Sequence, residues 1–133
     1  MNATAEQVAK ECTEGSDDGS LTFPQVVQKL MAAGVERYHA DLCRAEKIYY
    51  MPGGESYVTP SATLKGNPAQ NFSAAGVEAA VRAIQQGKTS YAAFCEQINA
   101  AGCVGYFVSL VGRRAVYYGR TCETYVEPFP GAK

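Results

Sequence analysis

The sequence predicts an α+β fold in which a helix–helix–strand–strand–strand unit is used twice. Residues 87–128 follow the pattern of residues 19–60 without a gap, at an offset of 68. Twelve of the 42 aligned positions are identical, where average composition would give roughly two or three. Within each unit, the apolar residues change from helical spacing to strict alternation. These observations favour an antiparallel sheet covered by helices on one face.

The chain length of 133 residues fits one domain. We expect two repeats, 1–60 and 73–128, joined by a connector at 61–72 that contains Ser, Gly, Asn and Pro. Each repeat is small enough to depend on the other for its hydrophobic core.

Capping residues mark the helix starts. The first helix is expected from near Thr4, whose spacing to Gln7 matches a capping box, and its counterpart follows Ser73. The second helix starts at Thr22, with a capping box to Gln25. Helical spacing then predicts these buried stripes: Ala5, Val8, Ala9 and Cys12; Phe23, Val27, Leu30 and Met31; Val77, Ala80, Val81 and Ile84; and Tyr91, Phe94, Cys95 and Ile98.

Strands follow the glycines that end the second helices. Gly34 and Gly102 stand where a left-handed cap requires glycine. In the first strand of each unit, Tyr38, Ala40 and Leu42 alternate with His39, Asp41 and Cys43, and Tyr106, Val108 and Leu110 alternate with Phe107, Ser109 and Val111. The repeat keeps Tyr and Leu, so we assign their face to the core. The remaining strands are expected at 47–51, 55–59, 115–118 and 123–127.

Composition limits the classes of partner. The formal net charge is −1 and the pI is near 5.8, so we expect no nucleic-acid partner. No apolar run is long enough to span a bilayer, and the N-terminal residues lack the pattern of a signal peptide. We therefore expect a cytoplasmic protein with no membrane association.

The cysteines and the lone histidine do not form a metal-binding pattern. Five irregularly spaced cysteines are typical of reduced thiols, most of them in the core. A metal site would need the fold to bring together Cys43, His39, Cys95 and Cys103, so we predict no metal. The sequence contains no phosphate-binding or dinucleotide fingerprint, and we predict no cofactor.

Two short motifs resemble a known family. Ala32-Ala-Gly-Val-x-x-Tyr, followed by Lys47-Ile-Tyr-Tyr and Gly54-Glu-Ser-Tyr, is similar to the bacterial and prophage YdfO-like proteins, as is Ala100-Ala-Gly-Cys-x-x-Tyr with Ala115-Val-Tyr-Tyr-Gly. That family has no known function and is sometimes labelled "phage envelope protein". The resemblance implies a small α+β fold and a prophage setting, and it transfers no catalytic or binding residue.

One strand face carries residue types that could support catalysis. His39, Asp41 and Cys43 alternate along one strand, and a cysteine nucleophile needs a base and a group that orients the base. The matching positions of the second copy lack this chemistry. The alternative interpretation is a half-exposed strand face.

Aromatic and basic residues suggest a contact surface. We expect Tyr49 and Tyr117, together with Tyr57 and Tyr125, to form an aromatic surface on the uncovered face of the sheet, where Phe107 and Val111 could seat a partner. Arg113 and Arg114 form the basic cluster. Tyrosines also stabilise antiparallel sheets through cross-strand pairs, so the two roles remain open.

The leading hypothesis is a non-enzymatic protein-binding or assembly module, with self-association as one option. The alternatives are a small enzyme that uses His39 and Cys43, and a small-ligand protein with a pocket between the repeats.

Overall fold

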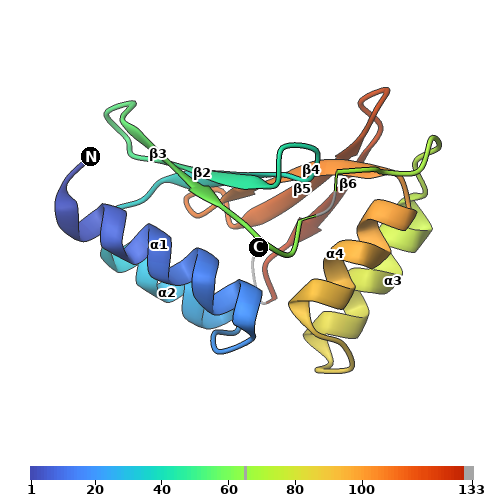
Figure 1. Cartoon of the computed structure of the whole chain (residues 1–133), viewed down its shortest axis with the longest axis horizontal. Helices are drawn as coiled ribbons and strands as arrows, with labels where there is room; N and C mark the ends of the chain where they lie inside the picture. Colours follow the sequence, from blue (N-terminus) through green and yellow to red (C-terminus); the bar gives the residue numbers. More distant parts are fainter. Residues whose placement is uncertain (65, 131–133) are drawn as a thin grey trace.

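The computed structural model describes residues 1–64 and 66–130. Within these residues, four helices pack on one face of a six-stranded antiparallel sheet, which confirms the predicted α+β fold (Figure 1). The helices are α1 (Ala3–Asp18), α2 (Phe23–Ala32), α3 (Ala74–Gln85) and α4 (Tyr91–Ala100). The strands are β1 (Arg37–Asp41), β2 (Glu46–Tyr50), β3 (Ser56–Pro60), β4 (Cys103–Ser109), β5 (Arg114–Gly119) and β6 (Thr124–Pro128).

Strands β1 and β4 form the centre of the sheet, whose order is β3-β2-β1-β4-β5-β6. Two helices followed by a three-stranded meander occur in each half of the chain, and the α1–α2 and α3–α4 pairs lie under opposite parts of the sheet (Figure 1). In the β1–β4 pair, His39 lies directly opposite Phe107. The sequence offset of 68 also aligns His39 with Phe107. The two halves of the sheet are therefore related by an approximate two-fold rotation that passes through this pair.

Side-chain caps fix the helix starts. Asn2 caps α1, because its Oδ1 accepts a hydrogen bond from the Ala5 N–H at 2.8 Å. The expected start near Thr4 is correct to within one residue, whereas the expected capping box from Thr4 to Gln7 is wrong, because Asn2 is the cap. The predicted capping box of α2 is confirmed: Thr22 Oγ1 accepts from the Gln25 N–H at 3.4 Å, and Gln25 Oε1 accepts from the Thr22 N–H at 2.8 Å.

Glycines end α2 and α4 as predicted. Gly34 has a φ of +83° and Gly102 a φ of +85°, both in the left-handed region. Ser73 caps α3 through the Gly76 N–H at 3.0 Å. The expected stripe of α2 is wrong in part, because Phe23 and Met31 are exposed. The buried side of α2 is instead centred on Val26 and Leu30, four residues apart.

A row of tyrosines crosses the covered face of the sheet. The row consists of Tyr57, Tyr49, Tyr38, Tyr106, Tyr117 and Tyr125. From Tyr49 to Tyr125, successive ring centroids are 5.1 to 6.5 Å apart. Tyr38, Leu42, Tyr106 and Leu110 are buried, which confirms the face assigned to the core. The tyrosines that the sequence repeat aligns therefore stabilise the sheet from inside the core.

Candidate functional site: the open face of the sheet

The face of the sheet opposite the helices is covered by no element of the described chain (Figure 1). We call it the open face. One side chain from each strand lies on a line across its middle, because each is the cross-strand partner of the next. This central row consists of Val58, Ile48, His39, Phe107, Val116 and Val126. An apolar row that crosses six strands gives the face a continuous hydrophobic centre.

The central row is accessible to a partner. Val58, Phe107 and Val126 are 50%, 43% and 44% exposed. They make up half of the six large hydrophobic residues that are exposed in residues 1–64 and 66–130. Isolated exposed hydrophobic residues are common, whereas several in one line on an uncovered sheet are typical of a contact surface.

His39 belongs to this row as a neutral aromatic residue. Its ring centroid lies 4.4 Å from that of Phe107, and its Nε2 is hydrogen-bonded to the Tyr118 hydroxyl at 2.7 Å. Burial lowers the pKa of His39, against a weaker opposing effect of Asp41. The imidazole is therefore uncharged at neutral pH and does not interrupt the hydrophobic row.

Rows of opposite charge flank the central row. On one side lies the basic row, Ser56, Tyr50, Arg37, Ser109, Arg114 and Pro128. On the other side lies the acidic row, Pro60, Glu46, Asp41, Gly105, Tyr118 and Thr124. The Arg37 guanidinium lies 4.0 Å from the Tyr50 ring centroid, and Arg44 in the adjacent turn pairs with Glu46 at 2.7 Å.

The structure gives His39, Asp41 and Cys43 separate roles. Asp41 Oδ1 accepts hydrogen bonds from the backbone N–H groups of Cys43 and Arg44, both at 3.0 Å, and so stabilises the β1–β2 turn. Among the hydrogen bonds of the described residues, none joins the His39 ring to Asp41 or to Cys43 Sγ. The base–thiol pair that the catalytic hypothesis requires is thus not assembled in this conformation.

All four tyrosines expected on the open face, Tyr49, Tyr57, Tyr117 and Tyr125, lie on the covered face. Tyr49 and Tyr117 are buried under the helices, so their assignment to an accessible contact surface is wrong. The reason is register: Tyr49 is the cross-strand partner of Tyr38, and both therefore point into the core. Their neighbours Tyr50 and Tyr118 point to the open face instead.

The remaining predicted contact residues divide between two surfaces. Phe107 and Arg114 lie on the open face, in the central and basic rows. Arg113 lies in the exposed β4–β5 turn, with a φ of +55°. Val111 lies in the same turn, beside Met31 and Pro52 in a shallow depression. The structure therefore separates Val111 from Phe107, with which we expected it to act.

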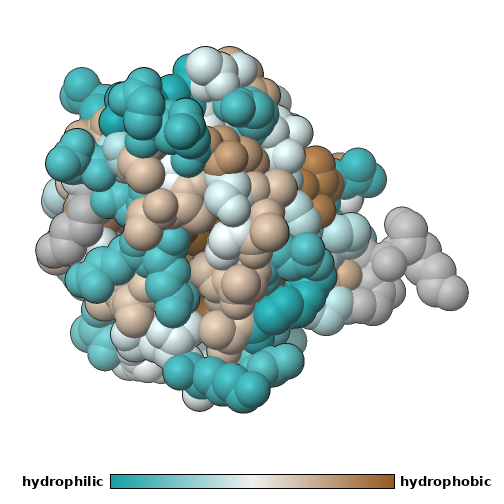
Figure 2. Space-filling view, turned by 90° about the vertical axis from the view of Figure 1, so that its right-hand side faces the viewer, coloured by the Kyte–Doolittle hydropathy of each residue, from teal (hydrophilic) through white to brown (hydrophobic). Residues whose placement is uncertain are grey.

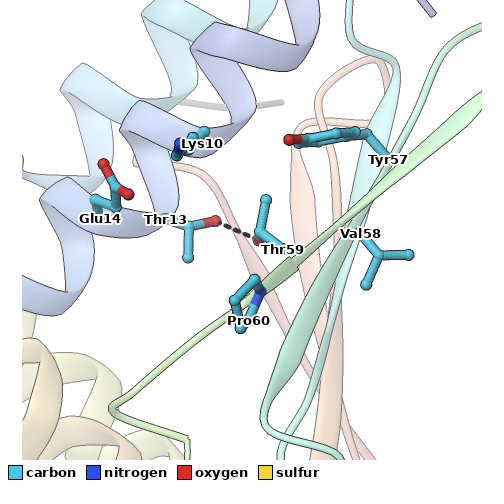
Figure 3. Close-up of a pocket in the computed structure, with 7 residues that line it drawn as sticks. All are labelled: Lys10, Thr13, Glu14, Tyr57, Val58, Thr59 and Pro60. Atoms are coloured by element: carbon cyan, nitrogen blue, oxygen red, sulfur yellow. Dashed lines mark hydrogen bonds between the residues drawn. The ribbon is translucent and has the colours of Figure 1, made fainter.

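Two concave sites in the described chain are small. The depression beside Val111 has a volume of about 210 Å³ and is lined by residues from both halves, including Val35 and Leu110. A second, of about 110 Å³, lies between α1 and β3 (Figure 3). Figure 3 shows Tyr57 and Thr59 on the α1 side of β3, whereas Val58 points away from it. Both volumes are below the roughly 300 Å³ at which small-molecule sites begin.

Lys47 is a buried charge that the sequence pattern did not reveal. It lies on the covered face, 2% exposed, with its Nζ 4.4 Å from the centroid of the Tyr91 ring on α4. Burial lowers the pKa of Lys47 to about 8. The matching position in the second half is Ala115, so the contact that Lys47 makes between the halves is asymmetric.

The outer side of α3 and α4 differs from the open face. Figure 2 shows the side on which these helices lie, where weakly hydrophobic residues in pale brown lie among hydrophilic residues in teal. Ala75, Ala79 and Ala92 are among the exposed residues of α3 and α4, and neither helix exposes a large hydrophobic residue. No helix in the described part of the chain is long and apolar enough to cross a membrane.

Comparison with known proteins finds a family that is similar to the second half of the chain. Residues 63–127 match a family described as protein of unknown function (DUF1398). The matched segment contains α3, α4 and strands β4 to β6 up to Glu127. No curated protein matches the chain.

In residues 1–64 and 66–130, no three His, Cys, Asp or Glu side chains are grouped so that they could hold a metal ion.

Proposed function

We propose that the protein is a non-enzymatic binding or assembly module that contacts a protein partner through its open face. The observation that carries this proposal is the apolar central row between a basic and an acidic row. Such a pattern suits a protein partner, because apolar contacts supply affinity and flanking charges supply orientation. The acidic row disfavours a polyanion, since Asp41 and Glu46 would repel phosphates.

The proposal also covers the cellular setting. All five cysteines are free, which supports the predicted cytoplasmic location, where thiols remain reduced. The prophage setting that the family resemblance implies is compatible with an assembly role and stays a prediction.

Site-specific photo-crosslinking tests the proposal. A photoreactive phenylalanine analogue is placed at Phe107 and, as a matched control, at Phe23 on α2, since these residues are 43% and 41% exposed. We expect an adduct of defined mass from position 107 in cells of the source, and none from position 23. Excess unlabelled protein should suppress the adduct, and excess Phe107→Asp protein should not. Equal labelling at both positions, or none at position 107, would contradict the proposal.

A further inference from the structure

We propose that the partner of the open face is a second copy of this chain, packed face to face around a two-fold axis along the central row. This inference rests on the proposed function of the open face as a contact surface. Closed two-fold dimers are the commonest protein assemblies, and they require a surface that is complementary to itself.

The open face meets this requirement because its charges are divided by the central row. On β1, Arg37 lies two residues before His39 and Asp41 two residues after it. The two charges are roughly 13 Å apart along the strand, too far for contact within one chain. On β2, Tyr50 and Glu46 are placed in the same way around Ile48.

A two-fold rotation about the central row places the basic row of one copy over the acidic row of the other. Arg37 then faces Asp41 of the second copy, and Asp41 faces Arg37 of the second copy. Tyr50 faces the Glu46 carboxylate, which can accept a hydrogen bond from the phenol. Arg114 faces the ring of Tyr118, a favourable pairing of a cation with an aromatic face.

The alternative two-fold axis, parallel to the strands, gives a poorer match. It places Arg37 over Ser109 and Asp41 over Gly105, so no acid faces a base. The basic rows of both copies would then lie together, and so would the acidic rows, which costs free energy through like-charge repulsion. The side chains therefore select the axis along the central row.

The size of the face places it among small, transient interfaces. Six strands of about five residues span roughly 29 Å by 16 Å, or about 470 Å² per copy. This is smaller than the about 800 Å² per partner of standard interfaces, so we expect a reversible dimer with a dissociation constant of about 1 to 100 µM.

Sedimentation equilibrium in reducing buffer, at concentrations on both sides of that range, tests the inference. Arg37→Glu should weaken the dimer about tenfold or more, because the new carboxylate at position 37 of each copy then faces Asp41 of the other. Asp41→Lys should weaken it similarly, and the double variant Arg37→Glu/Asp41→Lys should restore it. Arg113→Glu, in the exposed turn outside the face, is the matched charge control and should leave the dimer unchanged. Thermal unfolding of each variant verifies that the β1–β2 turn is intact.

A second pair of variants tests the central row. Phe107→Asp should abolish the dimer, whereas Phe23→Asp should not. If Phe107→Asp stays dimeric, or if the double charge variant stays as weak as the single ones, the inference is wrong. If the unmodified protein is monomeric throughout and position 107 crosslinks to another protein, self-association is overturned and the proposed function stands. If position 107 gives no adduct, or if a single-stranded oligonucleotide binds in a manner that depends on Phe107, both the self-association and the proposed function are overturned.

Discussion

Replacing Lys47 with Met should stabilise the protein at neutral pH. The Lys47 ammonium is buried, and its pKa falls from 10.5 to about 8 because burial disfavours the charged form. This displacement corresponds to about 3 kcal/mol of destabilisation when the group is protonated in the folded state. The Tyr91 ring 4.4 Å away offsets about 1 kcal/mol of it. We therefore expect Lys47→Met to raise the unfolding free energy by about 2 kcal/mol at pH 7, since Met fills a similar volume.

The pH dependence separates this effect from simple repacking. Between pH 8 and 10.5 the unfolded chain binds more protons at Lys47 than the folded chain does, so the contribution of Lys47 to stability rises with pH in that window. The advantage of Lys47→Met should shrink across the same window. Burial raises the pKa of Cys12 and Cys103 from 9 to about 11, so their contribution is lost as pH rises above 9. The loss at Cys103 is common to both proteins and cancels in their difference. Lys47 itself lowers the pKa of Cys12, so its removal enlarges the Cys12 loss above pH 9, in the same direction as the expected shrinkage.

Urea denaturation of both proteins at pH 7, 8, 9 and 10, in reducing buffer, measures the difference. Lys10→Met, at an exposed site on α1, is the matched control and should give a small difference that does not change with pH. The reasoning is refuted if Lys47→Met is less stable than the unmodified protein at pH 7, or if their difference is constant from pH 7 to 10.

Two further predictions concern the cap glycines and the buried hydroxyls. Gly34→Ala should lower the unfolding free energy by about 1 kcal/mol through backbone strain alone, because a Cβ there meets only Met51 Cε at 3.6 Å. Gly102→Ala should lower it by at least about 3 kcal/mol, because its Cβ would also collide with the Asn71 carbonyl. Equal losses in chemical denaturation would contradict this difference. Thr13→Val should cost about 2 kcal/mol, because the Thr13 hydroxyl is bonded to the buried hydroxyls of Tyr49 and Thr59, each at 2.7 Å. Thr4→Val, at an exposed position of the same helix, is its control, and a loss of similar size there would contradict the hydrogen-bond explanation.

The sequence was most informative where a local rule determines the structure. Alternation along one strand placed Tyr38 and Leu42 in the core, and glycine at a helix end predicted the left-handed Gly34. The face of Tyr49 could not be predicted in this way, because Tyr50 follows it and either phase places a tyrosine in the core. The phase of β2 is set by its pairing with β1 across the turn, which is tertiary information.

The candidate site was harder to predict than the fold. The central row exists only because β1 pairs with β4, residues that are far apart in the sequence. Alternation along the strand identifies Phe107, whereas Val58 and Val126 lie in the predicted strands 55–59 and 123–127 with no pattern that distinguishes them. Their shared line with His39 follows from the register of five strand pairs, and no sequence spacing encodes it.

Backbone geometry supports the inference that both halves descend from one unit. Eight residues of the described chain have a left-handed φ, and they form four pairs at the offset of 68. The pairs are Gly19 and Gly87, Gly34 and Gly102, Ala45 and Arg113, and Gly54 and Cys122. Non-glycine residues seldom adopt this conformation, so its recurrence at matched turns is difficult to explain by independent origins.

A single unit should therefore form the six-stranded sheet by pairing with itself. The family match at residues 63–127 spans one unit, in which β4 loses its partner β1 and exposes an unpaired edge. Because Phe107 is aligned with its own partner His39, two copies of β4 can pair antiparallel about Phe107 and place both helix pairs on one face. We expect residues 63–130 carrying Val126→Asp, which blocks association through the open face, to sediment as a folded dimer. A folded monomer, or an unfolded chain at all concentrations, would show that the halves are not interchangeable and would contradict the predicted self-pairing of one unit.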